Sequence, residues 1–355
     1  MKLRQEILGN IRRVVVKLGS GLLTDDHHRL ALDRVENLVR QFAALHQQKR
    51  QLIIVSSGAI AAGMAELGLT RRPKELPELQ AAAAIGQSKL MAVYDRVFDG
   101  FDIHVAQVLL THDDLKNRAR HLNARNTLDT LLARGVVPII NENDTVAVDE
   151  IRFGDNDRLG ALTATLIDAD LLIILSHVEG LYEWFGTTKD PRPFQVIHTV
   201  EQITEHIQAL AGGTDRLTSV GGMVSKIEAA KIVTRAGIPM IIASGDRPNV
   251  IAELLAGEDV GTIFLPATGK LASRKRWIAF FQKPAGLLVV DDGAKQALCG
   301  AGKSLLAKGV VRTEGKFAAG DVVSICDATG AEFARGLVKT TDGSVMVHRD
   351  DLVIL

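Results

Sequence analysis

Short apolar runs alternate along the first three quarters of the chain with longer segments whose apolar residues recur at helical spacing. The runs that predict strands are Val14–Val16, Leu52–Val55, Ile103–Val108, Val136–Ile140, Leu171–Leu175 and Pro239–Ile242. The segments that predict helices are Leu32–Leu45, Leu79–Phe98, Ala124–Leu132, Leu159–Ile167 and Val224–Ala236. Apolar strands that alternate with helices are typical of a mostly parallel sheet flanked by helices on both faces. We therefore predict an α/β fold with a ligand site beyond the carboxyl ends of its strands.

The pattern changes after Gly261. A basic connector, Ser273–Arg276, precedes short strand candidates that are separated by Gly-rich turns. These strands are predicted at Leu287–Val290, Val310–Arg312, Asp321–Ile325, Glu332–Val338 and Val345–Val347, with one helix at Ala294–Leu298. Such closely spaced strands indicate a small β-barrel or sandwich. We predict a large domain over residues 1–265, a linker over 266–276 and a small β-rich domain over 277–355.

Composition narrows the class of protein further. The chain has 42 basic and 42 acidic residues, so no global charge draws it to nucleic acid or to a membrane. Its two cysteines, Cys299 and Cys326, cannot form a disulfide framework. No run approaches the roughly 18 apolar residues that a membrane helix needs. We expect a cytoplasmic protein without a membrane partner.

Polar residues follow several predicted strands, at the edge where a ligand site is expected. After the first strand, Lys17 leads into the turn Gly19–Gly21. Backbone N–H groups in such a turn can face phosphate oxygens, and the lysine can supply a point charge. A plain strand end with an exposed lysine has the same sequence, so both interpretations stay open for this cluster alone.

Two further polar clusters follow the second and fourth predicted strands. The small residues Ser56–Gly58 stand at a strand-to-helix junction, where helix N–H groups can bind an anion or a serine can simply cap the helix. Asn141–Asp144 and Phe153–Asp157 gather carboxylates and amides, which suit the ammonium group of an amino acid. The same residue types also favour turns.

The segment Gly221–Lys226 opens the last helix predicted in the large domain. Its two glycines allow a ligand to approach the backbone closely. Lys226 lies in the first helical turn, where the helix dipole disfavours a cation. This position suggests a bound anion, and a solvated lysine after a flexible loop is the alternative. The histidines show no paired metal-ligand spacing, so the metal ligands stay unknown.

Together these clusters resemble the amino acid kinase family. The matching pieces occur in order over nearly the whole chain: VVVKLGSG, IVSSGAIAAG, VPIINENDTVA, FGDNDRL, GLY at Gly180–Tyr182, GGMVSK and VHRDDL. The tail after Trp277 resembles a PUA domain. Among family members, the likeness is greatest to those that phosphorylate the γ-carboxylate of L-glutamate. The resemblance therefore implies the formation of γ-glutamyl phosphate from glutamate and ATP, the first step of proline biosynthesis.

The resemblance also implies a role for each matching residue. Lys17 and Lys226 are expected to contact the transferred phosphoryl group as catalytic residues, with Asp157 holding both lysines in place. The residues expected to bind glutamate are Ser57, Gly58, Asn141, Asp144 and Asn156. The residues expected to bind the nucleotide are Lys17, Gly19, Ser176, His177, Val220, Gly221, Gly222, Met223, Val224, Ser225 and Lys226.

The chain departs from the family pattern at three places. Ser176 and His177 stand where the family usually has Thr-Asp, the segment Glu183–Arg192 is longer than usual, and Val220 replaces a common threonine. These departures concern contacts to the purine and ribose. They leave the phosphate chemistry unchanged.

The expected chemistry needs no general base, because the γ-carboxyl group of glutamate has a pKa near ~4.3 and is ionised at neutral pH. An anion must instead approach a polyanion, which calls for positioning and positive charge. We expect in-line attack on the γ-phosphorus of ATP, with Mg²⁺ bridging the β- and γ-oxygens.

The resemblance further implies partners that the residues themselves do not specify. These are proline as feedback inhibitor, a homo-oligomer that is a tetramer, and a glutamyl phosphate reductase. The nearest alternative function is that of another family member, acting on acetylglutamate, carbamate, aspartate or a nucleotide. RNA binding through the tail is an alternative of another class. From Trp277 to Leu355, however, nine basic residues balance nine acidic ones, which is a poor electrostatic footprint for RNA.

Overall fold

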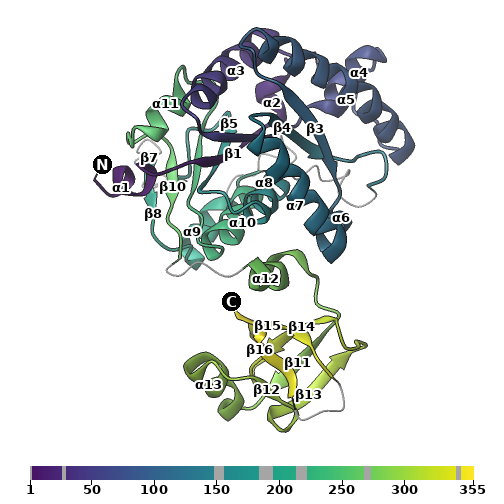
Figure 1. Cartoon of the computed structure of the whole chain (residues 1–355), viewed down its shortest axis with the longest axis vertical. Coiled ribbons are helices and arrows are strands. Elements are labelled where there is room, and N and C mark those ends of the chain that lie inside the picture. The colour runs from purple at the N-terminus through teal and green to yellow at the C-terminus, as the bar shows by residue number, and fades with distance from the viewer. Residues whose placement is uncertain are drawn as a thin grey trace, which may run out of the picture. The chain divides into compact units, whose positions relative to one another are not determined.

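The computed structural model describes residues 2–25, 29–147, 156–183, 195–212, 222–267, 273–340 and 345–355. The chain divides into two compact units, Met1–Thr268 and Gly269–Leu355 (Figure 1). The exact limits of the predicted domains stay a prediction. None of the helices in the described ranges combines the length and apolar character that crossing a membrane requires.

The first unit is built on an eight-stranded sheet with the order β3-β4-β2-β1-β5-β9-β10-β8. Neighbouring strands run parallel except for β9 and β10, which are antiparallel. The strands are β1 (Arg13–Leu18), β2 (Gln51–Val55), β3 (Val105–Leu110), β4 (Val137–Glu142), β5 (Leu171–Ser176), β8 (Thr199–Val200), β9 (Met240–Ser244) and β10 (Thr262–Phe264). A separate two-stranded pair consists of β6 (Tyr182–Glu183) and β7 (Gln195–Val196).

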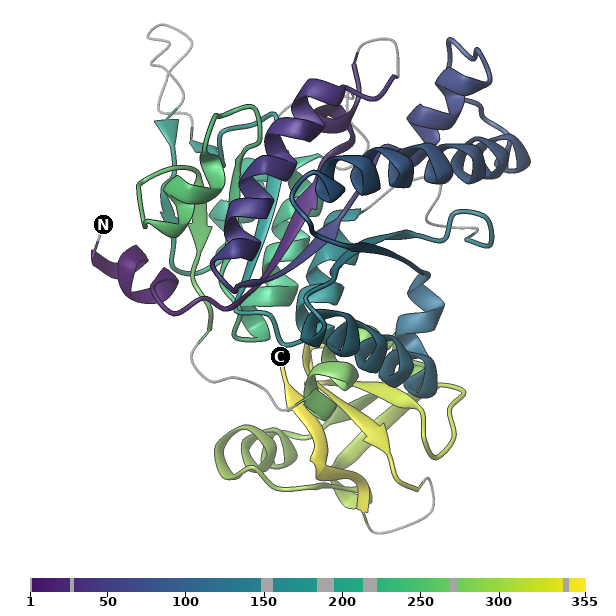
Figure 2. The same cartoon turned by 45° about the horizontal axis from the view of Figure 1, so that its top comes forward.

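Helices cover both faces of this sheet, which confirms the predicted fold class (Figure 1). On one face α3 (Leu32–Gln47) packs against α5 (Leu76–Asp99) and α11 (Val250–Leu255). On the other face α8 (Asn156–Leu166) packs against α10 (Met223–Arg235) and against β1 and β5. The turned view in Figure 2 shows the purple α3 and the dark-blue α5 in front of the strands. The remaining helices are α1 (Lys2–Leu8), α2 (Ser20–Leu23), α4 (Ala59–Glu66), α6 (His112–Lys116), α7 (Arg118–Ala133) and α9 (Glu205–Gly212).

The central strands are apolar because both of their faces are covered. In β1 and β2 every residue after the first is buried, and Val16, Ile54 and Ile173 belong to one continuous core cluster. Burial of such side chains is the main favourable term in folding. The buried strands therefore fix the positions at which the polar residues after their carboxyl ends begin.

Two glycines bring α4 and α5 into backbone contact next to the end of β2. A Cβ atom at Gly86 would lie 1.7 Å from the Ala59 carbonyl oxygen, and one at Gly63 would lie 1.8 Å from the Ala82 carbonyl oxygen. No larger residue fits at either position without movement of the backbone. This close packing fixes α4, whose first residue follows the polar segment Ser56–Gly58.

The second unit contains a six-stranded sheet with the order β12-β16-β15-β14-β11-β13. Its strands are β11 (Gly286–Val290), β12 (Leu305–Leu306), β13 (Val310–Gly315), β14 (Val322–Cys326), β15 (Glu332–Val338) and β16 (Val345–Ile354). Only the β11–β14 pair among them is parallel. The helix α13 (Asp292–Ala301) is capped by Asp291, whose carboxylate accepts from the Ala294 N–H at 2.7 Å. Ser273–Arg276, predicted as a connector, forms the short helix α12, and Trp277–Phe281 continues it as a π-helix.

Candidate active site

The site begins where β1 lies between β2 and β5, with the carboxyl ends of all three strands on the same edge. Ligands of open parallel sheets bind outside this edge. Lys17 is the last residue but one of β1. Asp157 is the second residue of α8, and Lys226 lies in the first turn of α10. Both helices cover the same face of the sheet, so the three side chains can meet.

The two lysines bind opposite oxygens of one carboxylate. Lys17 Nζ lies 2.7 Å from Asp157 Oδ1, and Lys226 Nζ lies 3.2 Å from Asp157 Oδ2. Lys17, Asp157 and Lys226 are 7%, 1% and 5% exposed. Buried charges are tolerated only when they are paired and hydrogen-bonded. Two ammonium groups that share one ionised carboxylate leave a net charge of one positive unit at this edge of the sheet.

Asp157 stays ionised in this setting. Burial pushes the pKa of the carboxyl group upward, but the ammonium groups of Lys17 and Lys226 outweigh burial, and the pKa of Asp157 lies below its ordinary value. The Ser225 hydroxyl adds a hydrogen bond of 2.6 Å to Oδ2. The same hydroxyl also contacts the carbonyl oxygen of Gly222, the N-cap of α10, at 2.9 Å. Ser225 therefore links the start of α10 to the start of α8.

A glycine allows α8 to pack against the stem of Lys17. A Cβ atom at Gly160 would lie 3.3 Å from Lys17 Cβ and 3.5 Å from Lys17 Cγ. Because Gly160 has no side chain, the helix approaches β1 closely enough for Asp157 to reach the lysine. The position of the ammonium group is thus set by packing as well as by charge.

A second polar group lies on the β2 and β4 side of β1. The Asn156 side-chain amide donates to the Ser56 carbonyl at 2.9 Å, to Ser57 Oγ at 2.9 Å and to Asn141 Oδ1 at 3.0 Å. Asn141 Oδ1 also accepts from the Glu142 N–H at 2.9 Å. Asn156 and Asp157 are neighbours in the chain, so the start of α8 serves both this network and the lysine pair.

The residues on either side of Ser57 are held by the hydroxyl group of Tyr94, which contacts Ser56, and by the backbone conformation of Gly58. The Tyr94 hydroxyl lies 2.9 Å from Ser56 Oγ in the core, and burial raises the pKa of Tyr94, so it remains a neutral phenol. Gly58, the N-cap of α4, has φ +93°, a left-handed conformation that favours glycine. Sequence reasoning marked Ser56 within the cluster Ser56–Gly58 but missed Tyr94, because their contact joins a strand end to the distant helix α5.

Asp144 lies beyond β4 in the turn before the residues that the structure leaves undescribed. Burial raises the pKa of its carboxyl group to about 6, while Arg72, in the connection between α4 and α5, lowers it. Gln80 of α5 donates to the Ala147 carbonyl at 3.2 Å, which ties this turn to α5. Arg72 was not among the predicted site residues.

On the other side of β1, the predicted nucleotide residues follow β5 and open α10. The Gly19 N–H donates to the Leu175 carbonyl at 3.0 Å, which joins the turn after β1 to the end of β5. Ser176 is half-buried and His177 is exposed. Gly222, Met223, Val224 and Ser225 lie at the start of α10, whereas Val220 and Gly221 lie outside the described residues.

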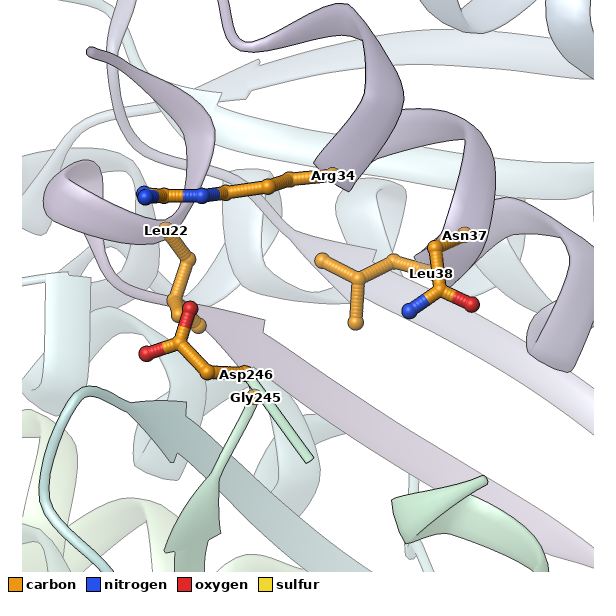
Figure 3. A pocket seen from close by; sticks show the side chains of 6 residues that line it. All are labelled: Leu22, Arg34, Asn37, Leu38, Gly245 and Asp246. Carbon is orange, nitrogen blue, oxygen red and sulfur yellow. The ribbon is translucent and has the colours of Figure 1, made fainter. Parts of the chain in front are cut away.

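A pocket of about 160 Å³ lies next to the turn after β1 and the end of β9 (Figure 3). It is lined by Leu22, Arg34, Asn37, Leu38, Gly245 and Asp246. None of these residues was predicted to belong to the site. In the ranges that the structure describes, no group of three or more His, Cys, Asp or Glu side chains could hold a metal ion.

Comparisons with known proteins show the family of the chain. The model of the amino acid kinase family matches residues 12–244, and the model of the PUA domain matches residues 286–346. A protein from Geobacter metallireducens named glutamate 5-kinase is 46% identical to this chain, and the match covers 99% of this chain and 100% of that protein. A second glutamate 5-kinase, from Syntrophotalea carbinolica, is 47% identical with the same coverage of both chains.

One solved structure shares the fold of the large unit. A carbamate kinase from Giardia lamblia bound to AMP-PNP matches with a TM-score of 0.51 and 18% identity, over 73% of this chain and 99% of that chain. At this level of identity the likeness concerns the fold alone.

Proposed function

This chain belongs to the amino acid kinase family, and we propose that it transfers the γ-phosphoryl group of ATP to the side-chain carboxylate of L-glutamate. The curated relatives that match it over their whole length are named glutamate 5-kinase. The product is γ-glutamyl phosphate, an acyl phosphate, formed in the first step of proline biosynthesis. The C-terminal unit carries the PUA domain.

The observation that carries this proposal is the pair of buried ammonium groups on Asp157. The chemical difficulty of the reaction is repulsion between a carboxylate and a triphosphate. Fixed positive charge in a water-poor site lowers that barrier, because it stabilises the charge of the phosphoryl group in the transition state. Asp157 keeps the two ammonium groups in place before the substrates arrive, so no reorganisation is needed during the reaction.

The reaction balances without a proton transfer. A γ-carboxylate oxygen of glutamate forms a bond to the γ-phosphorus while the bond from that phosphorus to the β–γ bridging oxygen breaks. ADP leaves with the electron pair of the broken bond. Lys17 is assigned to the transferred phosphoryl group, and Lys226 to the bridging oxygen, where negative charge develops.

The network around Asn156 is assigned to the amino acid. Ser56, Ser57 and Asn141 accept hydrogen bonds from the Asn156 amide at the ends of β2 and β4, and Gly58 follows Ser57 at the N-cap of α4. Asp144 is assigned to the α-ammonium group of glutamate, since a half-buried carboxylate is a suitable partner for a cation.

The nucleotide is assigned to the opposite side of β1. Its binding residues are Gly19, Ser176, His177 and the segment 220–226, of which the structure describes Gly222–Lys226. Magnesium is bound largely by phosphate oxygens and water in nucleotide sites. We assign the ion no step, and expect it to enter with ATP.

Other features follow from the family and are part of the proposal. They are a cytoplasmic location, a homotetramer, inhibition by proline, and transfer of the labile product to a glutamyl phosphate reductase. None of them enters the mechanism above.

The proposed function is tested by ADP release from the purified chain with L-glutamate, N-acetylglutamate, carbamate and L-aspartate as acceptors. Hydroxylamine added to the reaction converts an acyl phosphate to a hydroxamate, which identifies the product. We expect ADP and γ-glutamyl hydroxamate in equal amounts with glutamate, and background rates with the other acceptors. Preferential turnover of another acceptor would replace the proposed substrate.

A further inference from the structure

The in-line geometry of phosphoryl transfer decides where the rest of the nucleotide lies. The attacking and leaving oxygens stand on opposite sides of the transferred phosphorus. The proposed acceptor site, built on Asn156, Ser57 and Asn141, lies on the β2 and β4 side of Lys17. The ADP half must therefore extend over the ends of β5 and β9. This step rests on the proposed function.

At these two strand ends a histidine and an aspartate form a pair. His177 Nδ1 lies 2.8 Å from Asp246 Oδ2. The strand ends are joined next to the pair, because the Gly245 N–H donates to the Ser176 carbonyl at 2.9 Å. With Nδ1–H donated to the carboxylate, the imidazole ring has one fixed orientation.

The ring that Asp246 orients covers the turn after Lys17. A Cβ atom at Gly21 would lie 2.4 Å from His177 Nε2 and 2.8 Å from its Cδ2, so the ring edge contacts the backbone of Gly21. Arg34 Nη1 of α3 donates to the Gly21 carbonyl at 3.1 Å. Gly21 is thus contacted by both an arginine and a histidine. Asp246 and Arg34 also border the pocket shown in Figure 3.

We propose that Asp246 is a positioning residue for the polyphosphate of the nucleotide, acting through His177 on the Gly19–Gly21 turn. An anionic side chain at this edge would otherwise oppose a polyphosphate, since like charges repel. Its carboxylate is instead committed to the imidazole, which stays against the turn that the proposed function assigns to the nucleotide.

A positioning role for Asp246 and a role as a mere nearby charge predict opposite changes in nucleotide affinity when the carboxylate is removed. Removal of a nearby negative charge alone should strengthen nucleotide binding. Removal of a positioning group should weaken it. In Asp246→Ala we expect the Kd for ADP, measured by calorimetry, to rise about fivefold, the scale of losing one hydrogen bond. Asp246→Asn, whose amide oxygen can still accept from Nδ1–H, should retain most of the affinity.

Two controls make the result specific. Glu253→Ala removes a carboxylate near β9 that pairs with Arg247 and does not contact His177, so its Kd for ADP should equal that of the wild type. In a His177→Ala background, Asp246→Ala should have no further effect, because its only proposed route is the imidazole. Side chains of His177 and Asp246 are 50% and 44% exposed, so thermal unfolding should be unchanged in the variants of these two residues.

The result separates this inference from the proposed function. Unchanged or tighter ADP binding in Asp246→Ala overturns the positioning role, even if the wild type forms γ-glutamyl hydroxamate. Weaker ADP binding in Asp246→Ala supports the role, even if the wild type prefers another acceptor. An additive effect of the two substitutions also overturns it, because Asp246 would then act independently of His177.

Discussion

The Lys17 ammonium group lies 2.7 Å from a carboxylate oxygen of Asp157, and both side chains are buried. Lys17 lies near the end of β1 and Asp157 near the start of α8, so the sheet and the helix layer meet in this contact. Lys226 binds the second oxygen of the same carboxylate. The catalytic account depends on this arrangement being fixed before substrate binds.

Asp157→Asn should destabilise the fold, because it leaves two buried ammonium groups without an anion. Removal of one partner of a buried pair is strongly destabilising, and we expect a loss of about 3 kcal/mol in the free energy of unfolding near pH 7. Denaturant titration measures this loss. The surface variant Asp113→Asn, at a side chain that is 81% exposed, should change stability by less than about 0.5 kcal/mol.

The same pair predicts how the loss depends on pH. The pKa of Asp157 is lowered in the folded state, so its stabilisation is present above the unfolded value of about 3.9 and is lost as pH falls through the folded value. The difference between the wild type and Asp157→Asn should therefore shrink below about pH 4. A difference that stays constant with acidification would show that the charge of Asp157 is not the stabilising feature.

Asp144 predicts a pH dependence of substrate affinity. Burial raises its pKa to about 6, and only the ionised form attracts the α-ammonium group of glutamate. The KM for glutamate should rise as pH falls through about 6, with kcat little changed. The substrate itself does not cause this change, because its γ-carboxyl group has a pKa near ~4.3 and stays ionised over most of this range. A KM that is flat between about pH 5 and about pH 8 would remove Asp144 from this role.

Arg72 and its neighbour Arg71 form a matched test of the same site. Arg72 lowers the pKa of Asp144, so Arg72→Gln should move the inflection in the KM profile to higher pH. Arg71→Gln removes the same charge one residue away and should leave the inflection where it is. Equal shifts in both variants would mean that general charge, rather than a specific pairing, sets the profile.

Asn156→Ala should weaken glutamate binding, because three acceptors lose the amide that joins them. Loss of hydrogen bonds in a buried network leaves unpaired polar groups, and we expect the KM for glutamate to rise at least ~10-fold. Asn123→Ala, at an exposed position of α7, serves as the control in steady-state assays. A rise in the KM for ATP in place of that for glutamate would assign Asn156 to the nucleotide.

The sequence alone predicted the large elements well, because long periodic segments carry a strong signal. All six strands predicted in the large domain correspond to strands of the sheet, and Leu79–Phe98 lies within α5. The short strands β8 and β10 were missed, since two or three residues show no pattern. A helix was expected after Gly58, but the extent of the Ala-rich helix α4 was not predicted, because its small residues give no polar and apolar alternation. Its packing against α5 depends on glycine contacts.

The site could be predicted only in part. The strand ends indicated Lys17 and Ser57, and the resemblance supplied Asp157. The distances between these residues, however, depend on how α8 and α10 cover one face of the sheet. Tyr94 and Arg72 were missed because each reaches the site from a distant element. Asp246 could have been found by the rule that marked the other clusters, since it also follows a predicted strand.

The most direct measurement is single-turnover transfer of the γ-phosphoryl group from ATP to L-glutamate by the wild type, Lys17→Ala and Lys226→Ala. Lys231→Ala, on the same helix as Lys226 but paired with Glu228 away from Asp157, is the matched control. We predict that each of the first two substitutions lowers the rate at least ~100-fold, the scale of losing one group that stabilises transition-state charge, while Lys231→Ala keeps the wild-type rate. Near-normal transfer in either Lys17→Ala or Lys226→Ala would contradict the account.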